Sequence, residues 1–115
     1  MVVISLRLGP DSVFLRELVA DLVRSGPIQT IILHGSAACA AMRPQSDIDL
    51  LIVVPEPEHH SIVITVLERW NRQPYQLDPI VITIHEFRQR SKRQGDIVNI
   101  AATIGIVLYN MARPQ

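Results

Sequence analysis

The sequence has a single cysteine, few aromatic side chains and no net charge, and each shortage excludes a class of protein. One cysteine, Cys39, excludes an internal disulfide, which is compatible with a reducing compartment such as the cytoplasm. Eleven basic residues against eleven acidic ones leave no global field that would attract nucleic acid or a membrane surface. No apolar run approaches the ~18 residues of a membrane-spanning helix. We therefore expect a cytoplasmic protein, with no membrane contact and no indication of nucleic-acid binding.

Aromatic residues make up only 4% of the chain, whereas hydrophobic residues reach 48%. A core of this composition is built from Ile, Val and Leu, whose β-branched members favour strands. The length of 115 residues is near the commonest domain size. We expect one globular domain over residues 1–115. One local basic cluster breaks the even charge distribution, and a solvated helix face explains it better than a phosphate or RNA contact. The cluster consists of Arg88, Arg90, Lys92 and Arg93.

Hydrophobic periodicity, together with glycine and proline positions, predicts an alternation of helices and strands. The predicted strands cover Ile28–His34, Asp47–Val54, Gln76–Ile84 and Gly105–Tyr109. The predicted helices run from Pro10-Asp11-Ser12 to Gly26-Pro27, then over Ala37–Met42, Glu58–Arg72, His85–Gln94 and Asp96–Thr103. Residues Met1–Gly9 alternate loosely, which suits an extended arm or a short strand.

The connections between these elements predict how the strands pair. A helix joins the strands at 47–54 and 76–84, so these two should lie parallel through a right-handed crossover. Only about a dozen residues separate the strand at 28–34 from the next one, which suits an antiparallel or offset pairing. The expected fold is α/β, with a small mixed β-sheet and helices packed mainly on one face.

Two aspartates two residues apart, Asp47 and Asp49, open the apolar strand Asp47–Val54. Alternate residues of a strand share one face, so both carboxylates point the same way. As an ordinary explanation, Asp47 would cap the strand and Asp49 would face solvent. However, charge beside a core is costly unless something positive meets it. Two carboxylates at this spacing suit one or two hard divalent cations, Mg²⁺ or Mn²⁺.

Two further features would complete a site around this pair. Gly35-Ser36 follows the first strand directly, where a glycine turn, a hydroxyl and free N–H groups can bind phosphate oxygens. By itself such a pair is also an ordinary turn. Asp78 enters the third strand, and parallel pairing would place it beside Asp47 and Asp49. Its alternative role is that of a turn residue before Pro79, which itself favours a strand edge or start.

The segment Leu33-His34-Gly35-Ser36, followed by Ser46-Asp47-Ile48-Asp49-Leu50-Leu51-Ile52, resembles the signature of the nucleotidyltransferase superfamily that includes DNA polymerase β. More narrowly, the chain resembles the minimal nucleotidyltransferases, or MNT-domain proteins. The resemblance covers most of the chain, and its last part, Ile104–Tyr109, looks like the closing strand of that family. The combination of Gly-Ser with Asp-x-Asp at this spacing is specific.

Membership of that family implies a two-metal transfer of a nucleoside monophosphate, most simply AMP from ATP, to a hydroxyl acceptor. The resemblance assigns Mg²⁺ binding to Asp47, Asp49 and a third carboxylate, for which Asp78 is the candidate. It assigns phosphate binding to Gly35 and Ser36. Related proteins often act as antitoxins that AMPylate a tyrosine of a helical HEPN-type toxin, so a protein partner or a homo-oligomer is expected.

Two departures from the family pattern leave a second interpretation open. The family often has Ala-Arg-Gly shortly after Gly-Ser, whereas this chain has Ala38-Cys39-Ala40, and Arg43 is a candidate replacement for the absent arginine. Pro79 follows the third carboxylate. A degenerate member that binds nucleotide or a partner without transfer is therefore the alternative. An α/β interaction module unrelated to this family would require the whole motif to be chance.

The remaining polar residues point to structural roles. His34 is expected to be packed or to cap the strand rather than to be catalytic. Glu86 and Asp96 suit helix starts. The histidines His59, His60 and His85 do not form a convincing zinc set. Trp70 and Tyr109 are expected in the core or at an interface.

Overall fold

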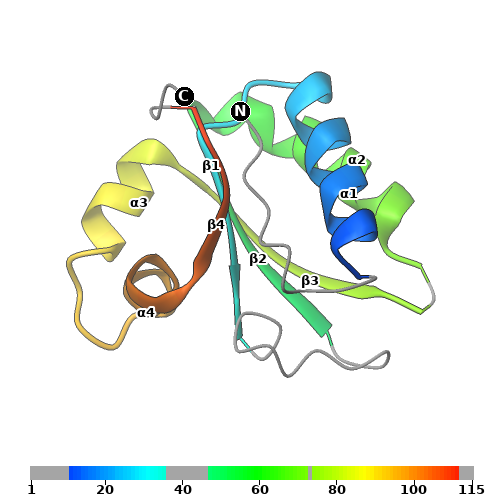
Figure 1. Ribbon diagram of the computed structural model, residues 1–115. Coiled ribbons are helices and arrows are strands. Elements are labelled where there is room, and N and C mark those ends of the chain that lie inside the picture. Colours follow the sequence, from blue (N-terminus) through cyan, green and yellow to red (C-terminus); the bar gives the residue numbers. More distant parts are fainter. Residues whose placement is uncertain (1–10, 36–46, 73, 112–115) are drawn as a thin grey trace.

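The computed structural model describes residues 11–35, 47–72 and 74–111, which form a four-stranded mixed sheet with helices on both faces (Figure 1). The order of the strands across the sheet is β3-β2-β1-β4. Their bounds are Thr30–His34 for β1, Asp47–Val54 for β2, Gln76–Thr83 for β3 and Ile106–Asn110 for β4. The arm predicted over Met1–Gly9 and the helix predicted over Ala37–Met42 lie outside the described residues.

The pairing of the strands confirms the mixed sheet. β2 and β3 are parallel, whereas β1 is antiparallel to both β2 and β4. β3 lies at an edge of the sheet, where Pro79 can be accommodated because an edge strand need not pair on both sides. The parallel pair brings the starts of β2 and β3 to one end of the sheet, together with the end of the antiparallel β1.

The helices divide between the two faces of the sheet (Figure 1). The longer helices, α1 and α2, cover one face, in line with the expectation that most helical packing lies there. The shorter α3 and α4 lie on the other face. The helix bounds are Asp11–Ser25 for α1, His60–Trp70 for α2, Ile84–Arg90 for α3 and Ile97–Ile104 for α4.

Alternation along β2 explains how both faces are filled. Its even-numbered residues pack with Leu15, Leu18 and other residues of α1 and α2. Leu51 and Val53 pack on the opposite face against Val98 and Ala101 of α4. Complete burial of a Leu, Ile or Val side chain stabilises a fold by about 1.5–3 kcal/mol. By the same alternation, Asp47 and Asp49 belong to the α3/α4 face.

Three helices differ from the predicted bounds for local reasons. The predicted helix Glu58–Arg72 begins with a short 3₁₀ helix, η3 (Pro57–His59), and becomes α-helical only at His60. The helix predicted to Gln94 ends at Arg90, and the chain then turns through Gly95 with φ 88°. The last helix begins at Ile97 because the Asp96 side chain caps it, accepting a bond from the Val98 N–H at 2.8 Å. Asp96 is therefore a helix-start residue, as predicted.

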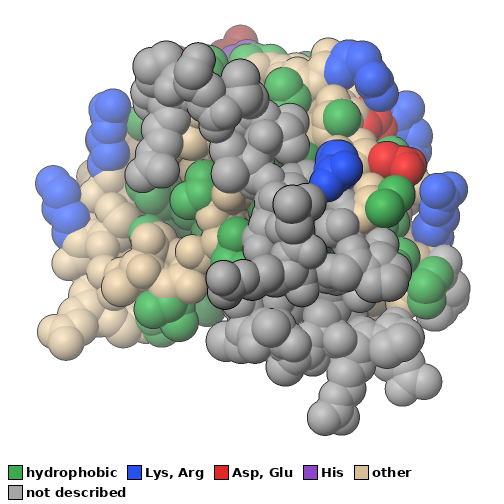
Figure 2. Space-filling view, in the orientation of Figure 1, with side chains coloured by type: hydrophobic (Ala, Val, Ile, Leu, Met, Phe, Trp, Pro, Cys, Tyr) green, Lys and Arg blue, Asp and Glu red, His purple; other side chains and the backbone are tan. Residues whose placement is uncertain are grey.

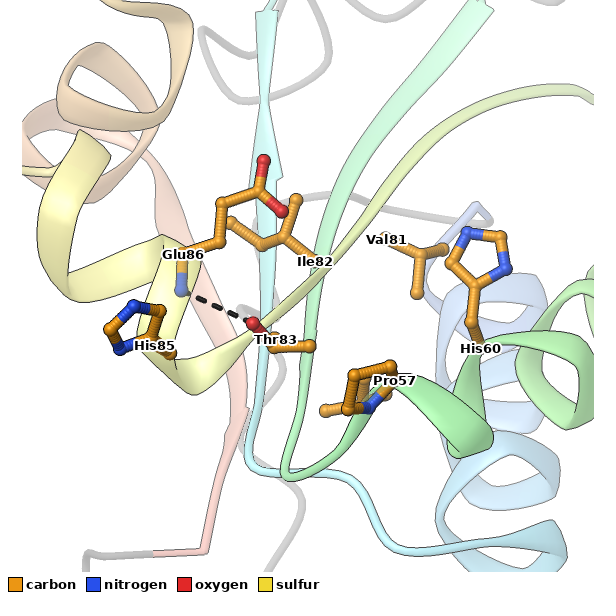
Figure 3. Close-up of a pocket in the computed structure, with 8 residues that line it drawn as sticks. Pro57, His60, Val81, Ile82, Thr83, His85 and Glu86 are labelled. Carbon is orange, nitrogen blue, oxygen red and sulfur yellow. Dashed lines mark hydrogen bonds between the residues drawn. The ribbon is translucent and has the colours of Figure 1, made fainter.

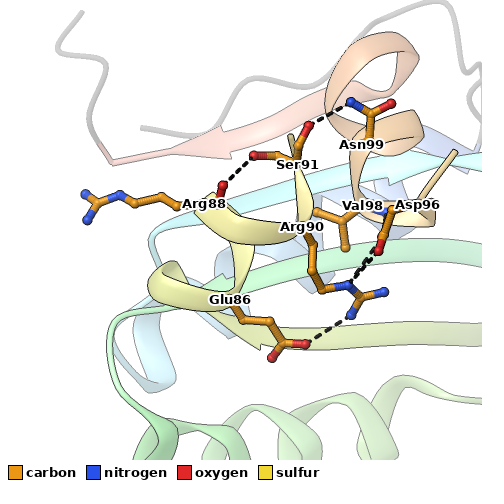
Figure 4. Close-up of polar contacts among 7 residues, drawn as sticks. All are labelled: Glu86, Arg88, Arg90, Ser91, Asp96, Val98 and Asn99. Carbon is orange, nitrogen blue, oxygen red and sulfur yellow. Dashed lines mark hydrogen bonds and ion pairs between the residues drawn. The ribbon is translucent and has the colours of Figure 1, made fainter. Parts of the chain in front are cut away.

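A polar cluster joins α3 to α4 (Figure 4). The Arg90 guanidinium donates to Glu86 at 3.1 Å and to both oxygens of Asp96 at 3.2 and 3.3 Å. Asn99 donates from its side-chain amide to the Ser91 carbonyl at 2.7 Å. One member of the basic cluster, Arg90, is thus occupied by carboxylates. In the view of Figure 2, Lys and Arg side chains lie mostly along the two sides of the face.

The contact between α1 and α2 is also fixed by polar and aromatic groups. The Trp70 indole N–H donates to Asp21 at 2.7 Å, and the Phe14 ring meets the Trp70 ring edge to face with centroids 5.7 Å apart. Trp70 is half-buried against the core and Tyr109 is buried within it, as expected of core residues. Within the described ranges, no helix is both long enough and apolar enough to cross a membrane.

Candidate functional site

The register of β2 and β3 brings the predicted carboxylates together. Asp49 of β2 is the direct partner of Asp78 in β3, and Asp47 lies two residues earlier on the same face. Neighbouring strands are about 4.8 Å apart, so side chains on paired positions can touch. Asp47 and Asp78 are exposed, whereas Asp49 is half-buried. The expectation that Asp78 would lie beside the Asp-x-Asp pair is therefore correct.

The electrostatics of this acidic cluster (Asp47, Asp49 and Asp78) are unfavourable to three bare charges. Burial raises the pKa of Asp49 above its ordinary value, and the hydrogen-bonding contact with Asp78 raises it further. The nearby negative charges of Asp78 and Asp47 act in the same direction. A hydrogen bond between two carboxyl groups requires a proton on one of them. A bound cation would supply the positive charge that the cluster lacks.

Gly35 has a geometric role beside Asp49. Its φ is 71°, in the left-handed region that favours glycine. A Cβ placed on Gly35 would overlap the Asp49 carboxylate and would lie 3.0 Å from its Cγ. The missing side chain therefore leaves the space in which the Asp49 carboxylate lies against the backbone at the end of β1. Sequence reasoning proposed a close approach of phosphate to Gly35, but it did not find this approach of Asp49.

The residues present suit a divalent cation in their chemistry. Carboxylate oxygens are the ligands that Mg²⁺ and Mn²⁺ prefer. Three carboxylate side chains lie at one end and on one face of the sheet. One of the three, the Asp49 carboxylate, lies against the backbone at Gly35. Among the described residues, no three His, Cys, Asp or Glu side chains already form a set that could hold a metal ion. The Asp49 carboxyl group is instead paired with that of Asp78.

Several predicted contributors lie outside the described part of the chain. These are Ser36 and the proposed replacement Arg43. His34 is described and buried, with 6% of its surface exposed, so its predicted packed character is confirmed. It is the cross-strand partner of Asp49.

A pocket that the sequence did not reveal lies at the other end of β2 and β3 (Figure 3). Its volume is about 430 Å³, and it is bounded by the last residues of both strands and the first turns of α2 and α3. Val54, Pro57, Val81 and Ile82 form its apolar part, and Thr83, His60, His85 and Glu86 its polar part. His60 and His85 lie on opposite sides of the pocket in Figure 3. Two of the three histidines that the sequence analysis noted, His60 and His85, line this pocket, but their positions in the sequence did not predict a cavity.

Comparison with known proteins shows which family has a matching sequence. Residues 15–101 match the family model of the nucleotidyltransferase domain, which is more than half of the chain. The chain belongs to this nucleotidyltransferase family. The matched range contains Gly35, both aspartates of β2 and Asp78. No protein of curated function matches the sequence.

Solved structures agree with the fold of a nucleotidyltransferase. A crystal structure of a candidate nucleotidyltransferase from Sulfolobus solfataricus matches with a TM-score of 0.50 and 23% sequence identity. The match covers 66% of this chain and 69% of that one. At this identity the likeness supports the fold alone. The mixed sheet and its helices are therefore those of a nucleotidyltransferase domain, as the Gly-Ser and Asp-x-Asp motifs predicted.

Proposed function

We propose that this nucleotidyltransferase transfers a nucleoside monophosphate, most simply AMP from ATP, to a hydroxyl acceptor in a Mg²⁺- or Mn²⁺-dependent reaction. The observation that carries the proposal is the direct pairing of Asp49 with Asp78, with Asp47 on the same face and Gly35 under the Asp49 carboxylate. Three converging carboxylates have little structural use without a cation. When bound, divalent metal neutralises the triphosphate and the charge that develops during transfer.

Each residue has a proposed task in this reaction. Asp47, Asp49 and Asp78 would be the metal ligands. Gly35 and Ser36 would hold the β- and γ-phosphates, with Ser36 assigned by family resemblance alone. Asp78 would also lie near the acceptor hydroxyl and help to remove its proton. The acceptor oxygen attacks the α-phosphorus, the bond to the β-phosphate oxygen breaks, and pyrophosphate leaves.

A protein acceptor is the proposed partner, and the exposed surface of α4 supports it. Ile97, Ile100 and Ile104 are 41–67% exposed and recur at helical spacing on one side of α4. The Gly105 turn that ends α4 lies against Ile32 and the Leu33 carbonyl, just before His34 and Gly35. Exposed apolar side chains so close to a site are typical of an interaction surface. A helical HEPN-type toxin with an acceptor tyrosine is the proposed partner, and a second copy of this chain is the alternative.

Transfer can be tested with ATP labelled at the α-phosphate, Mg²⁺, and protein that co-purifies with the chain from its source. We expect label on the partner, and no label with the Asp47→Asn variant. Glu17→Gln, an equivalent change on the exposed side of α1, should label like the unmodified chain. A partner tyrosine replaced by phenylalanine should lose the label if the acceptor is that tyrosine. Neutralisation of the partner that persists in Asp47→Asn without any label would contradict the proposal.

A degenerate protein that binds nucleotide without transfer remains the second candidate. The observation that favours it is Ala38-Cys39-Ala40 in place of the family's Ala-Arg-Gly. A phosphate site that lacks its arginine would bind triphosphate more weakly. Calorimetry with ATP and Mg²⁺, together with a pyrophosphate assay on the same samples, separates the two. Binding without pyrophosphate release in the presence of the partner would support the degenerate protein.

A further inference from the structure

His34 is the buried polar side chain of the described core, and one of its ring atoms is left without a partner. The residue ends β1 and is only 6% exposed. Its Nε2 is buried and makes no hydrogen bond with any described residue. Buried polar atoms in folded proteins are nearly always hydrogen-bonded, so an exception points to a partner that is gained in another state. The nature of that partner follows from where the ring lies.

The imidazole lies beside the acidic cluster. His34 and Asp49 are cross-strand partners in the antiparallel β1–β2 pair. Both belong to the α3/α4 face, because Ile32 and Leu51, two residues from each, pack in the same cluster there. Paired side chains on one face of an antiparallel sheet start about 4.5–5.5 Å apart, within reach of one another. The charge interaction with His34 lowers the pKa of Asp49, against the upward effects of burial and Asp78, which agrees with this closeness.

We propose that His34 is a positioning residue, whose Nε2–H donates a hydrogen bond to the Asp49 carboxylate when that carboxylate turns from Asp78 toward a divalent cation. The inference rests on the proposed function, in which Asp49 is a metal ligand. Hydrogen bonds to a ligating carboxylate fix its orientation and are part of most metal sites. A triphosphate is a less suitable partner, because Nε2 is shielded from solvent while Asp49 is on the adjacent strand.

This role predicts opposite effects on folding and on binding. In the described fold, Nε2 makes no hydrogen bond that a substitution could remove. His34→Leu, an apolar side chain in a buried place, should therefore leave the melting temperature unchanged or raise it. The same variant should bind a metal–nucleotide complex about tenfold or more weakly, the usual effect of losing a group that orients a metal ligand. His34→Gln should restore most of the affinity, since its side-chain amide can donate from nearly the same place.

The test is calorimetric titration with the Mn²⁺ complex of α,β-methylene-ATP, which cannot release pyrophosphate, with melting temperatures measured on the same samples. His85→Leu makes the same change on an exposed histidine at the far end of the strands and should bind as the unmodified chain does. If His34→Leu does not fold, His34→Met, which also lacks a donor, takes its place.

Three results would overturn the inference, and they differ in what else they affect. Equal binding by the unmodified chain and His34→Leu would reject the role of His34 and leave the proposed function intact. Equal losses in His34→Leu and His34→Gln, in step with lower melting temperatures, would show a packing role alone. Failure of the unmodified chain to bind the complex would reject the proposed function together with the inference.

Discussion

Two groups of carboxylates in this molecule have opposite surroundings. Between α3 and α4, Glu86 and Asp96 share the guanidinium of Arg90. At the start of β2 and β3, Asp47, Asp49 and Asp78 lie together on one face of the sheet, and the charge of His34, the cross-strand partner of Asp49, acts on Asp49. The first group is complete within the fold. In the second group, burial and the neighbouring carboxylates disfavour the charge of Asp49.

The pKa directions express the same difference. The hydrogen bond from Arg90 is the main cause that lowers the pKa of Asp96, and the Val98 N–H adds to it. Burial is the main cause that raises the pKa of Asp49, followed by its contact with Asp78. One carboxylate is stabilised in its charged form by the fold and the other is destabilised. A carboxylate whose charge the fold disfavours, near the start of a strand, is a candidate for function rather than for stability.

The largest difference should appear when one carboxylate in each group is neutralised. Asp49→Asn should reduce nucleotidyl transfer at least ~100-fold, because loss of a direct metal ligand costs more than loss of a group behind it. Asp96→Asn should keep full activity and lower the melting temperature, because the α4 cap and the Arg90 contact weaken. Transfer assays and thermal unfolding on both variants check this. Equal activity of the two variants would show that the groups do not differ in function.

Two glycines of the described residues, Gly35 and Gly95, have positive φ and permit a second comparison. Gly35→Ala and Gly95→Ala both place a side chain in the left-handed region, which costs about 1–2 kcal/mol of stability. Only the alanine at 35 would also displace a carboxylate, since nothing lies within 4 Å of a Cβ at Gly95. We expect a further loss of ~10-fold or more in metal–nucleotide affinity for Gly35→Ala alone. Affinity that falls equally in both variants would reject the role of Gly35 in placing Asp49.

The pH dependence of stability should separate the groups without any assay of activity. The pKa of Asp49 is raised above 3.8 in the fold. Its contribution to the free energy of unfolding is therefore full below pH ~3.8 and is lost as the pH rises through its folded pKa. The pKa of Asp96 is lowered, so its contribution is present above pH ~3.8 and is lost as the pH falls through its folded pKa.

Melting curves from pH 3 to 7, recorded with a chelator, give the measurement. Asp49→Asn should gain stability relative to the unmodified chain as the pH rises. Asp96→Asn should lose stability over the same rise. Differences of the same sign for both variants would contradict the pKa directions.

The smallest effect is expected when Arg90, the residue that pairs with Glu86 and Asp96, is replaced. Arg90→Met removes both ion pairs of a side chain that is 26% exposed, so the free energy of unfolding should fall by only about 0.5–1 kcal/mol. Binding of the metal–nucleotide complex should not change, because the α3–α4 contact is not part of the acidic cluster. Denaturant unfolding and calorimetry measure the two quantities, and weaker binding at unchanged stability would extend the site to α3.

Local patterns were enough for many elements. The bounds of β2 were predicted without error, because a continuous apolar run rich in β-branched residues follows the two aspartates and stops at Pro55. The strand predicted over Ile28–His34 is shorter in the fold, where β1 begins at Thr30. The helix predicted to Gln94 ends early as well, at Arg90. After it, backbone hydrogen bonds between residues three apart form turns in place of further helix. The pocket between α2 and α3 was missed because its lining residues are distant in the sequence.

The sequence by itself determined that Asp47 and Asp49 share a face, because the two-residue repeat of a strand requires no knowledge of its neighbours. It also determined the family, since the Gly-Ser and Asp-x-Asp motifs are each formed by residues next to one another in the chain. Only the tertiary structure decided that Asp49 stands between Asp78 on one side and His34 on the other, over the bare backbone of Gly35. Those positions depend on the register of three strands, and register is fixed by packing and hydrogen bonds between residues far apart in the chain.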